Sequence, residues 1–301
     1  MKSLNETKKG YLLILLTGTL WGTMGLFVTT LSDMGVDSFL TAFLRVFFGS
    51  IFLIFVALYI NGKDGLIPNR TELVFAFFMG IICQVLFNLC YTYAINTVGI
   101  ATGAILLYTS PVFVAIMSRI VFSDKITWVK IVALIINIIG CILTVTNGNF
   151  NVLELSKLGI FLGATAGFFY ALLTILGKLA ANKNCNMVTI SLYSFFFATV
   201  FLALIAKPWD SLAGLISIKL IVVSIFYGII PTALAYLLYM KGLTKPIKAS
   251  KVPVIASVET IVAALIGVLI FNEIFGMYKI IGIILVIISV LLISNVKEDT
   301  C

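Results

Sequence analysis

The sequence predicts an all-α integral membrane protein with ten transmembrane helices, arranged as two inverted five-helix repeats. Three observations support this prediction: the composition, the spacing of the apolar segments and an internal period of 149 residues. Of the 301 residues, 61% are hydrophobic and only 11% are charged, and the mean hydropathy is +1.19. Soluble domains are typically about 45–50% apolar and about 25% charged. The composition therefore excludes a soluble globular protein.

The apolar residues form blocks of about 20, the length at which a helix crosses the hydrocarbon core of a bilayer. Short polar segments such as Asn61-Gly62 and Asn147-Gly148 separate the blocks. The first block, from Tyr11 to Leu31, is long for a signal peptide and lacks a clear small-residue cleavage site, so we expect it to be a transmembrane helix. The ten predicted spans are 11–31, 38–60, 72–95, 100–122, 127–146, 158–180, 187–206, 219–243, 250–271 and 278–295.

Lysine and arginine are distributed unequally between the segments that join these spans. With the N-terminus inside, fifteen of them lie on the cytoplasmic side and four on the opposite side. Cytoplasmic loops are enriched in these residues. We therefore expect a multi-pass protein of the cytoplasmic (inner) membrane, with the N-terminal segment 1–10 and the C-terminal segment 296–301 both in the cytoplasm. The same bias explains the net charge of +8 without a nucleic-acid partner.

The two halves of the chain correspond at an offset of 149 residues. Asp124 and Glu273 each separate two spans, and the offset also relates Gly18 to Gly167. Both glycines belong to Gly-x-x-x-Gly motifs, which let helices approach closely.

Each repeat, 11–146 and 158–295, holds five spans. Because five is odd, the second repeat must enter the membrane upside down, with 147–157 as an extracytoplasmic linker. Inverted repeats are typical of secondary transporters, whose substrate site lies near the midplane between the repeats.

Aromatic and charged residues deep in the spans are the first candidates for that site. The offset relates Trp21 to Tyr170, and we expect these two and Phe169 to face the central space, because they lie too deep for an interfacial belt. Glu259 lies about 14 Å into its span and Arg45 about 10 Å. A charge at such depth normally faces the bundle interior and has a partner. Glu259 is either a contact for a substrate amine, a protonation site or a structural carboxyl, whereas Arg45 is expected to have a structural or gating role near the outer face.

Two polar stripes with helical spacing complete the predicted lining. They suit a small amphiphilic solute, and hydrogen bonding between helices is the alternative explanation. The stripes are Gln84, Asn88 and Tyr91 in one span, and Thr232, Tyr236 and Tyr239 in another. Pro111, which follows Tyr108, and Pro253 are expected to kink their helices and to have structural or gating roles, because freed carbonyls are tolerated only inside protein or beside a cavity.

Several motifs are absent from the sequence. Histidine is missing, the five cysteines form no C-x-x-C, and no nucleotide-binding G-x-x-x-x-G-K-[ST] occurs. The joins are also too short to build an aqueous active site. We therefore expect no metal, no cofactor and no enzymatic activity, and we rank an enzyme acting on lipids below a transporter.

These features resemble the drug/metabolite transporter superfamily, in its ten-helix branch with two EamA domains. The resemblance covers nearly the whole chain. It depends on Leu20-Trp21-Gly22, Phe43-Leu44-Arg45, Tyr93-Ala94, Ser110-Pro111-Val112-Phe113, Gly159, Tyr170-Ala171, Glu259 and Phe271-Asn272-Glu273. The chain departs from the family pattern at Glu259-Thr260, where the family often has Glu-Pro, and at Asp124, where a glutamate is usual. The family pattern implies a cavity lined by the first, third, fourth, sixth, eighth and ninth spans, with Asp124 and Glu273 as turn residues.

The expected function is transport of a small metabolite by alternating access. An aromatic, amide-rich lining with one acid favours export of neutral or aromatic amino acids or related compounds. The predicted substrate-binding residues are Trp21, Gln84, Asn88, Tyr91, Tyr108, Tyr170, Tyr236 and Glu259. Nucleotide sugars or drug-like solutes are alternative substrates, and a sensor or assembly subunit that does not transport is an alternative function. The expected partners are the substrate and the lipid bilayer, and the sequence leaves undecided whether the protein forms a homodimer.

Overall fold

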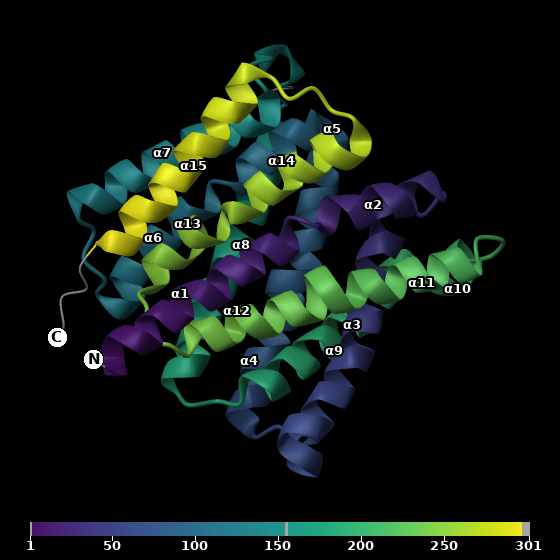
Figure 1. Ribbon diagram of the computed structural model, residues 1–301. Helices are drawn as coiled ribbons and strands as arrows, with labels where there is room; N and C mark the ends of the chain where they lie inside the picture. The colour runs from purple at the N-terminus through teal and green to yellow at the C-terminus, as the bar shows by residue number, and fades with distance from the viewer. Residues whose placement is uncertain (1, 154–155, 297–301) are drawn as a thin grey trace.

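The computed structural model describes residues 2–153 and 156–296, which form a bundle of helices with no strand in either range (Figure 1). Within these ranges nine helices are long and apolar enough to cross a membrane, and the shorter helix Ser110–Phe122 completes a tenth span. The predicted fold class is therefore confirmed. Residues 154–155 of the predicted linker and 297–301 of the predicted C-terminal segment lie outside the described residues.

The first repeat contains the helices α1 (Lys2–Trp21), α2 (Met24–Asp33), α3 (Ser38–Asn61), η1 (Gly62–Leu66), α4 (Arg70–Gly80), η2 (Ile81–Leu86), α5 (Phe87–Leu107), α6 (Ser110–Phe122) and α7 (Trp128–Thr146). After η3 (Phe150–Val152), the second repeat contains α8 (Lys157–Asn182), α9 (Met187–Ala206), α10 (Pro208–Ser211), α11 (Ile218–Tyr227), η4 (Gly228–Leu234), α12 (Ala235–Leu243), η5 (Ala249–Lys251), α13 (Val252–Ala256), α14 (Val258–Phe271) and α15 (Met277–Asn295).

The predicted ends of the third and fourth spans, residues 95 and 100, leave room for a short loop between them. The structure has no such loop. Helix α5 contains the end of one span and the start of the next, and the chain turns at Gly99 with φ 75° and ψ 166°. Such a conformation is open to glycine and costly for other residues. A single glycine therefore reverses the chain here. The predicted loop 96–99 contains this glycine but is longer than the turn in the structure.

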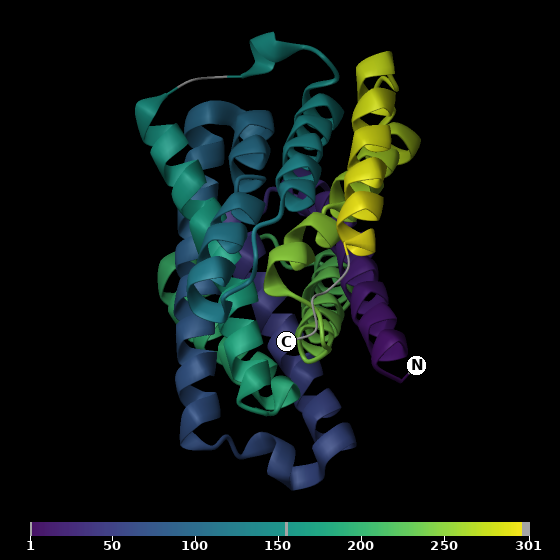
Figure 2. The same cartoon turned by 90° about the vertical axis from the view of Figure 1, so that its left-hand side faces the viewer.

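Contacts between distant segments show which joins share an end of the bundle. At the N-terminal end, Lys245 Nζ lies 2.6 Å from Glu6 Oε2, and Lys251 Nζ donates to the Tyr11 hydroxyl and to the carbonyl of Val296. At the other end, which we call the linker end, a carbonyl of the 272–276 join accepts from Asn147. Figure 2 shows η3 at the end opposite the N-terminus. The 244–251 and 272–276 segments, which precede and follow the ninth span, thus lie at opposite ends of the bundle, as the ten-span prediction requires.

The two repeats share local geometry at the predicted offset. Ser123 and Asn272, 149 residues apart, both adopt the left-handed conformation at the end of a helix, with φ 56° and 55°. The next residue in each case donates its backbone N–H six residues back, Asp124 to Ser118 at 3.3 Å and Glu273 to Gly267 at 3.0 Å. These turns lie at opposite ends of the bundle, which is the signature of an inverted repeat.

Small residues join the repeats to each other. A Cβ placed on Gly18 would press into the carbonyl of Ala256, so α1 lies directly against α13 of the other repeat. A Cβ on Gly167 would lie 3.1 Å from the carbonyl oxygen of Leu106, so α8 lies against the fourth span. The two contacts are related by the repeat. The helices α7 and α15, by contrast, pack side by side at one edge of the bundle (Figure 1), where a Cβ on Gly140 would lie 2.9 Å from a backbone oxygen.

Three spans are broken near the middle of the bundle, and the three breaks share one local hydrogen bond. The breaks lie between α1 and α2, between α5 and α6, and between α13 and α14. In each, a hydroxyl side chain bonds to the carbonyl three residues earlier: Thr23 to Leu20 at 2.7 Å, Thr109 to Leu106 at 2.6 Å and Ser257 to Val254 at 2.6 Å. This bond competes with the helical backbone pattern. The second and third breaks correspond within one residue at the 149-residue offset.

Candidate functional site

A cavity of about 470 Å³ lies between the two repeats. Its wall is built by the first, second, third and fourth spans of one repeat and the sixth, seventh, eighth and ninth of the other. The second and seventh spans contribute in addition to the six that the family pattern implies. The helices α7 and α15, the fifth and tenth spans, contribute no lining residue, and they are also not among the six spans that the family pattern implies.

All eight residues predicted to contact substrate lie on this wall: Trp21, Gln84, Asn88, Tyr91, Tyr108, Tyr170, Tyr236 and Glu259. They come from the first, third, fourth, sixth, eighth and ninth spans, and the fold alone brings them together. Their placement is a fact of the structure, and their role as substrate contacts stays a prediction. Of the two stripes, Tyr239 does not reach the wall, because it lies one helical turn nearer the N-terminal end.

Aromatic rings cover one side of the cavity. The Trp21 ring lies 5.7 Å from that of Tyr170, which in turn lies 5.9 Å from that of Phe87. Phe87 stacks on Tyr91 with the centroids 5.6 Å apart and the planes at 11°. Phe169, which was also expected to face the central space, is not among the lining residues. Its ring lies beside that of Phe168, with the centroids 6.0 Å apart.

Two π-helical segments place polar groups on the wall. They are η2 and η4, which the offset of 149 residues relates to within two residues. In η2 the side chain of Gln84 faces the cavity, and its backbone carbonyl accepts from Asn88 at 2.6 Å. In η4 the ring of Pro231 removes a backbone donor, and Thr232 donates to the carbonyl of Tyr227 five residues back. Short π-helical segments of this kind inside α-helices are frequent at functional sites.

Arg45 lies on the cavity wall with 8% of its surface exposed. Its Nη2 donates to Gln84 Oε1 at 3.1 Å, and its Nη1 lies 3.8 Å from the Met24 sulfur. The buried Nε has no partner among the described residues. The guanidinium is therefore held in place by neutral groups and has no acidic partner in the described chain.

Glu259 lies in the first turn of α14, directly after the break at Ser257. Its side chain lines the cavity and forms no hydrogen bond or ion pair with a described residue. The side chains around it are phenols: Tyr91, Tyr108 and Tyr170 all lie close enough to interact with it electrostatically. The cavity thus carries one cation and one carboxylate that do not neutralise each other by direct contact.

The cavity is closed toward the N-terminal end and reaches the linker end. Between the cavity and the N-terminal end, the hydroxyls of Tyr239 and Thr174 share a hydrogen bond of 2.6 Å. In the same region Lys178 Nζ donates to the carbonyls of Leu243 and Lys245 at 2.9 and 2.8 Å. At the linker end the lining includes Ser32, Ser38 and Ile100, and Ile100 is 74% exposed. The structure is therefore a conformation that opens at the linker end.

The two prolines with predicted structural or gating roles lie away from this wall. Pro111 is in the first turn of α6, after the break at Thr109, and Pro253 is in the first turn of α13. Proline fits the first turn, where its missing N–H has no partner to lose. The fourth span is broken at Thr109, two residues before Pro111, and the break of the ninth span falls at Ser257, four residues after Pro253.

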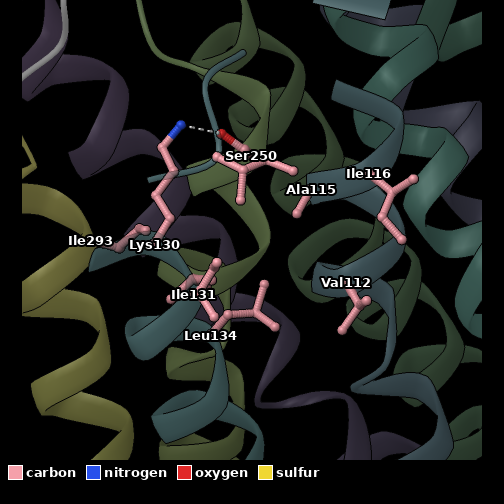
Figure 3. Close-up of a pocket in the computed structure, with 10 residues that line it drawn as sticks. Val112, Ala115, Ile116, Lys130, Ile131, Leu134, Ser250 and Ile293 are labelled. Atoms are coloured by element: carbon pink, nitrogen blue, oxygen red, sulfur yellow. Dashed lines mark hydrogen bonds between the residues drawn. The ribbon is translucent and has the colours of Figure 1, made fainter. Parts of the chain in front are cut away.

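A second cavity of about 220 Å³ lies between α6, α7 and α13 (Figure 3). Its lining is apolar except for Lys130 and Ser250, and Lys130 Nζ donates to the Ser250 hydroxyl at 3.1 Å. Asp124 accepts from the same hydroxyl at 3.1 Å. These groups satisfy one another, so they tie the join after α6 to η5 and leave little to orient a solute. Asp124 is thus a turn residue, and the 2.7 Å ion pair between Glu273 and Lys279 gives its counterpart the same place at the linker end.

The described residues contain no group of three histidine, cysteine, aspartate or glutamate side chains that could hold a metal ion. Sequence reasoning missed several residues of the wall, chiefly Met24, Phe87, Phe195 and Tyr227. Hydrophobic and aromatic residues occur throughout every span, so no sequence signal separates these four from residues that face lipid. Arg45 was assigned to the outer face, although its depth in an apolar span was the signal that could have placed it on the cavity.

An inverted pair of five-span repeats around a polar cavity is the architecture of a membrane transporter. The model of the EamA-like transporter family matches residues 8–146 and again residues 157–295, and the chain belongs to this family. The resemblance noted in the sequence is therefore confirmed, and the chain is a multi-pass membrane transporter.

Relatives and solved structures agree with this assignment. The chain is 29% identical over 279 residues to an uncharacterized transporter of Archaeoglobus fulgidus, covering 93% of this chain and 94% of that one. It is 24% identical to the uncharacterized inner membrane transporter YicL of Salmonella typhimurium, covering 97% of both. A protein known from a crystal structure superposes with a TM-score of 0.80 over 95% of this chain and 96% of that one, at 14% identity, which shows a shared fold.

Proposed function

We propose that this transporter moves neutral or aromatic amino acids, or related small metabolites, out of the cell by alternating access. The observation that carries the proposal is the cavity between the repeats, whose wall gathers aromatic rings, amide groups and one carboxylate at the level where three spans are broken. Its volume falls in the range of small-molecule sites, about 300–1,000 Å³. The cavity is closed toward the N-terminal end and open at the linker end, which fits one of the two states between which such a carrier alternates.

The proposal includes a location and an orientation. The chain is a protein of the cytoplasmic membrane with both termini inside, because the joins at the N-terminal end are rich in lysine and arginine. In this orientation the structure opens to the outside. The orientation is tested in a variant without native cysteines: Lys125→Cys, at the N-terminal end, is expected to react with a membrane-impermeant maleimide only after the cells are opened. Ile274→Cys, 80% exposed at the linker end, is expected to react in intact cells.

The transport activity is tested with purified protein in two steps. In the first step, thermal unfolding is followed with amino acids, nucleotide sugars and drug-like amines as separate additives. A ligand at about 100 times its Kd stabilises the folded state by about 2.7 kcal/mol, which is a measurable shift in Tm. In the second step, the protein is placed in liposomes preloaded with unlabelled amino acid, and uptake of the labelled compound by exchange is measured. We expect stabilisation by neutral amino acids and exchange that depends on the protein.

Three results would contradict parts of this proposal. Stabilisation by a nucleotide sugar or a drug-like amine, with none by amino acids, would replace the substrate class. Stabilisation by an amino acid without exchange would indicate a sensor rather than a carrier. Labelling of residues 125 and 274 from the same side would remove the inverted-repeat basis of alternating access.

A further inference from the structure

We propose that the cavity binds a zwitterion, with Arg45 holding the carboxylate of the substrate and Glu259 holding its ammonium group. This inference rests on the proposed function and assigns its substrate class. It also replaces the structural or gating role that the sequence suggested for Arg45.

The first step of the argument is the unmatched charge of Arg45. A buried cation is stable when an anion or enough acceptors compensate it, and the described neighbours of Arg45 on the wall are an amide, a thioether and a phenol, Gln84, Met24 and Tyr227. A guanidinium has five N–H donors. Gln84, Met24 and Tyr227 engage only part of this set, and the buried Nε has no partner among the described residues. The planar fork of an arginine matches a carboxylate in two parallel hydrogen bonds, and a substrate carboxylate supplies both the charge and the acceptors.

The second step is the surroundings of Glu259. Its carboxylate has no cation within bonding distance in the described chain, and the aromatic side chains Tyr91, Tyr108 and Tyr170 lie near it. An ammonium group is attracted both by a carboxylate and by the faces of aromatic rings. The combination of one acid with several rings suits an amine better than it suits a sugar hydroxyl or an apolar ring.

The third step is the relative position of the two charges. Both flank the break in the first span: a Cβ on Gly22 would lie 2.7 Å from the backbone oxygen of Glu259, and Met24, two residues on, contacts Arg45. The charges thus share one section of the cavity without forming an ion pair. A cation alone would leave Arg45 unmatched, and an anion alone would leave Glu259 unmatched. A zwitterion satisfies both at once and keeps the occupied cavity neutral, which favours its passage through a low-dielectric membrane.

The experiment measures binding by thermal shift and isothermal titration calorimetry. The probes are phenylalanine and leucine, each with its carboxamide, which lacks the carboxylate, and its deaminated acid, which lacks the ammonium. We expect the wild type to bind at least one of the two amino acids at least about 100-fold more tightly than either analogue, because buried polar groups left unpaired reject an analogue strongly. The variants are Arg45→Gln and Glu259→Gln, with Thr199→Val, in α9 and away from the wall, as the neutral control.

Each variant is expected to lose one kind of discrimination. Arg45→Gln should bind the amino acid at least about 100-fold more weakly while its affinity for the carboxamide changes little. Glu259→Gln should weaken the amino acid and leave the deaminated acid unchanged. Thr199→Val should keep the wild-type ratios. Where Arg45→Gln does not fold, Arg45→Lys carries the test, since it keeps the charge without the fork and should narrow the ratio of amino acid to carboxamide.

Other outcomes would overturn the inference without touching the proposed function. Equal weakening of amino acid and carboxamide in Arg45→Gln, or an unchanged ratio in Arg45→Lys, would return Arg45 to a structural role. Loss of accumulation driven by a pH gradient in Glu259→Gln, with binding ratios unchanged, would make Glu259 a protonation site instead. A wild type that binds neither amino acid would contradict the proposed function itself.

Discussion

The contact between Gly18 and Ala256 holds the first span of one repeat against the ninth span of the other, and replacing Gly18 by alanine tests it. A Cβ at position 18 would overlap the Ala256 carbonyl oxygen and lie 3.1 Å from its carbonyl carbon and 3.2 Å from its Cα. These atoms are backbone, so no side-chain rotation relieves the overlap and α1 and α13 must separate. Overpacking of this kind costs about 1–3 kcal/mol.

Gly25→Ala is the matched control, because α2 is the continuation of the same span and nothing lies within 4 Å of a Cβ at Gly25. Both substitutions replace a helical glycine and gain roughly 0.5–1 kcal/mol in helix propensity. The difference between the two variants therefore isolates the steric cost at Gly18. For a chain of 301 residues, 1 kcal/mol corresponds to about 2 °C in Tm.

The assay is thermal unfolding of the purified proteins in detergent, followed by intrinsic fluorescence. We expect Gly18→Ala to unfold roughly 2–6 °C below Gly25→Ala, and Gly25→Ala to unfold at or slightly above the wild type. Equal Tm values for the two variants would show that α1 does not lie against α13 in the folded protein, and the packing of the two repeats described above would then be wrong.

Two further predictions concern polar groups that hold helix ends. Glu72 forms a capping box with Asn69 at the start of α4 and also accepts from the backbone N–H of Asn186 at 2.7 Å. Glu72→Ala should therefore lower the free energy of unfolding by about 1–2 kcal/mol, measured by thermal unfolding. A change no larger than that of the exposed Lys63→Ala would contradict the capping role. Asn137, inside α7, donates to the Ser257 hydroxyl at 2.6 Å. Asn137→Ala should lower the free energy of unfolding by about 1–3 kcal/mol and also weaken ligand binding measured by calorimetry. A variant with the wild-type Tm would show that this bond does not stabilise the break at Ser257.

The sequence predicts the large features of this fold because their causes are local or periodic. The length of each apolar block sets the spans, and the distribution of lysine and arginine predicts which joins share a side. The 149-residue offset predicts that equivalent helix ends exist, and the left-handed residues Ser123 and Asn272 confirm it. Polar residues buried in apolar spans, such as Gln84 and Glu259, lie on the cavity for the same reason: facing lipid is costly for them.

The features that the sequence does not predict depend on contacts between distant residues. Arg45 reaches the cavity because Gln84, 39 residues away, holds its guanidinium, and no pattern within either span shows that pairing. Phe87 and Phe195 line the wall, whereas Phe169 does not. In a span that is apolar on every face, only the tertiary packing decides which aromatic ring points inward.

The breaks in the helices join these two kinds of feature. The hydroxyl bond found at Thr23 and Ser257 also occurs at Ser50, inside the unbroken helix α3, so a serine or threonine does not by itself break a helix. What differs is the location: residues at or beside all three breaks line the cavity. Irregular backbone at membrane depth is tolerated only where protein or a cavity surrounds it. The cavity therefore permits the breaks, and the breaks direct Trp21 and Glu259 toward the cavity. The site and the irregular backbone thus stabilise each other, and neither is encoded by a local motif alone.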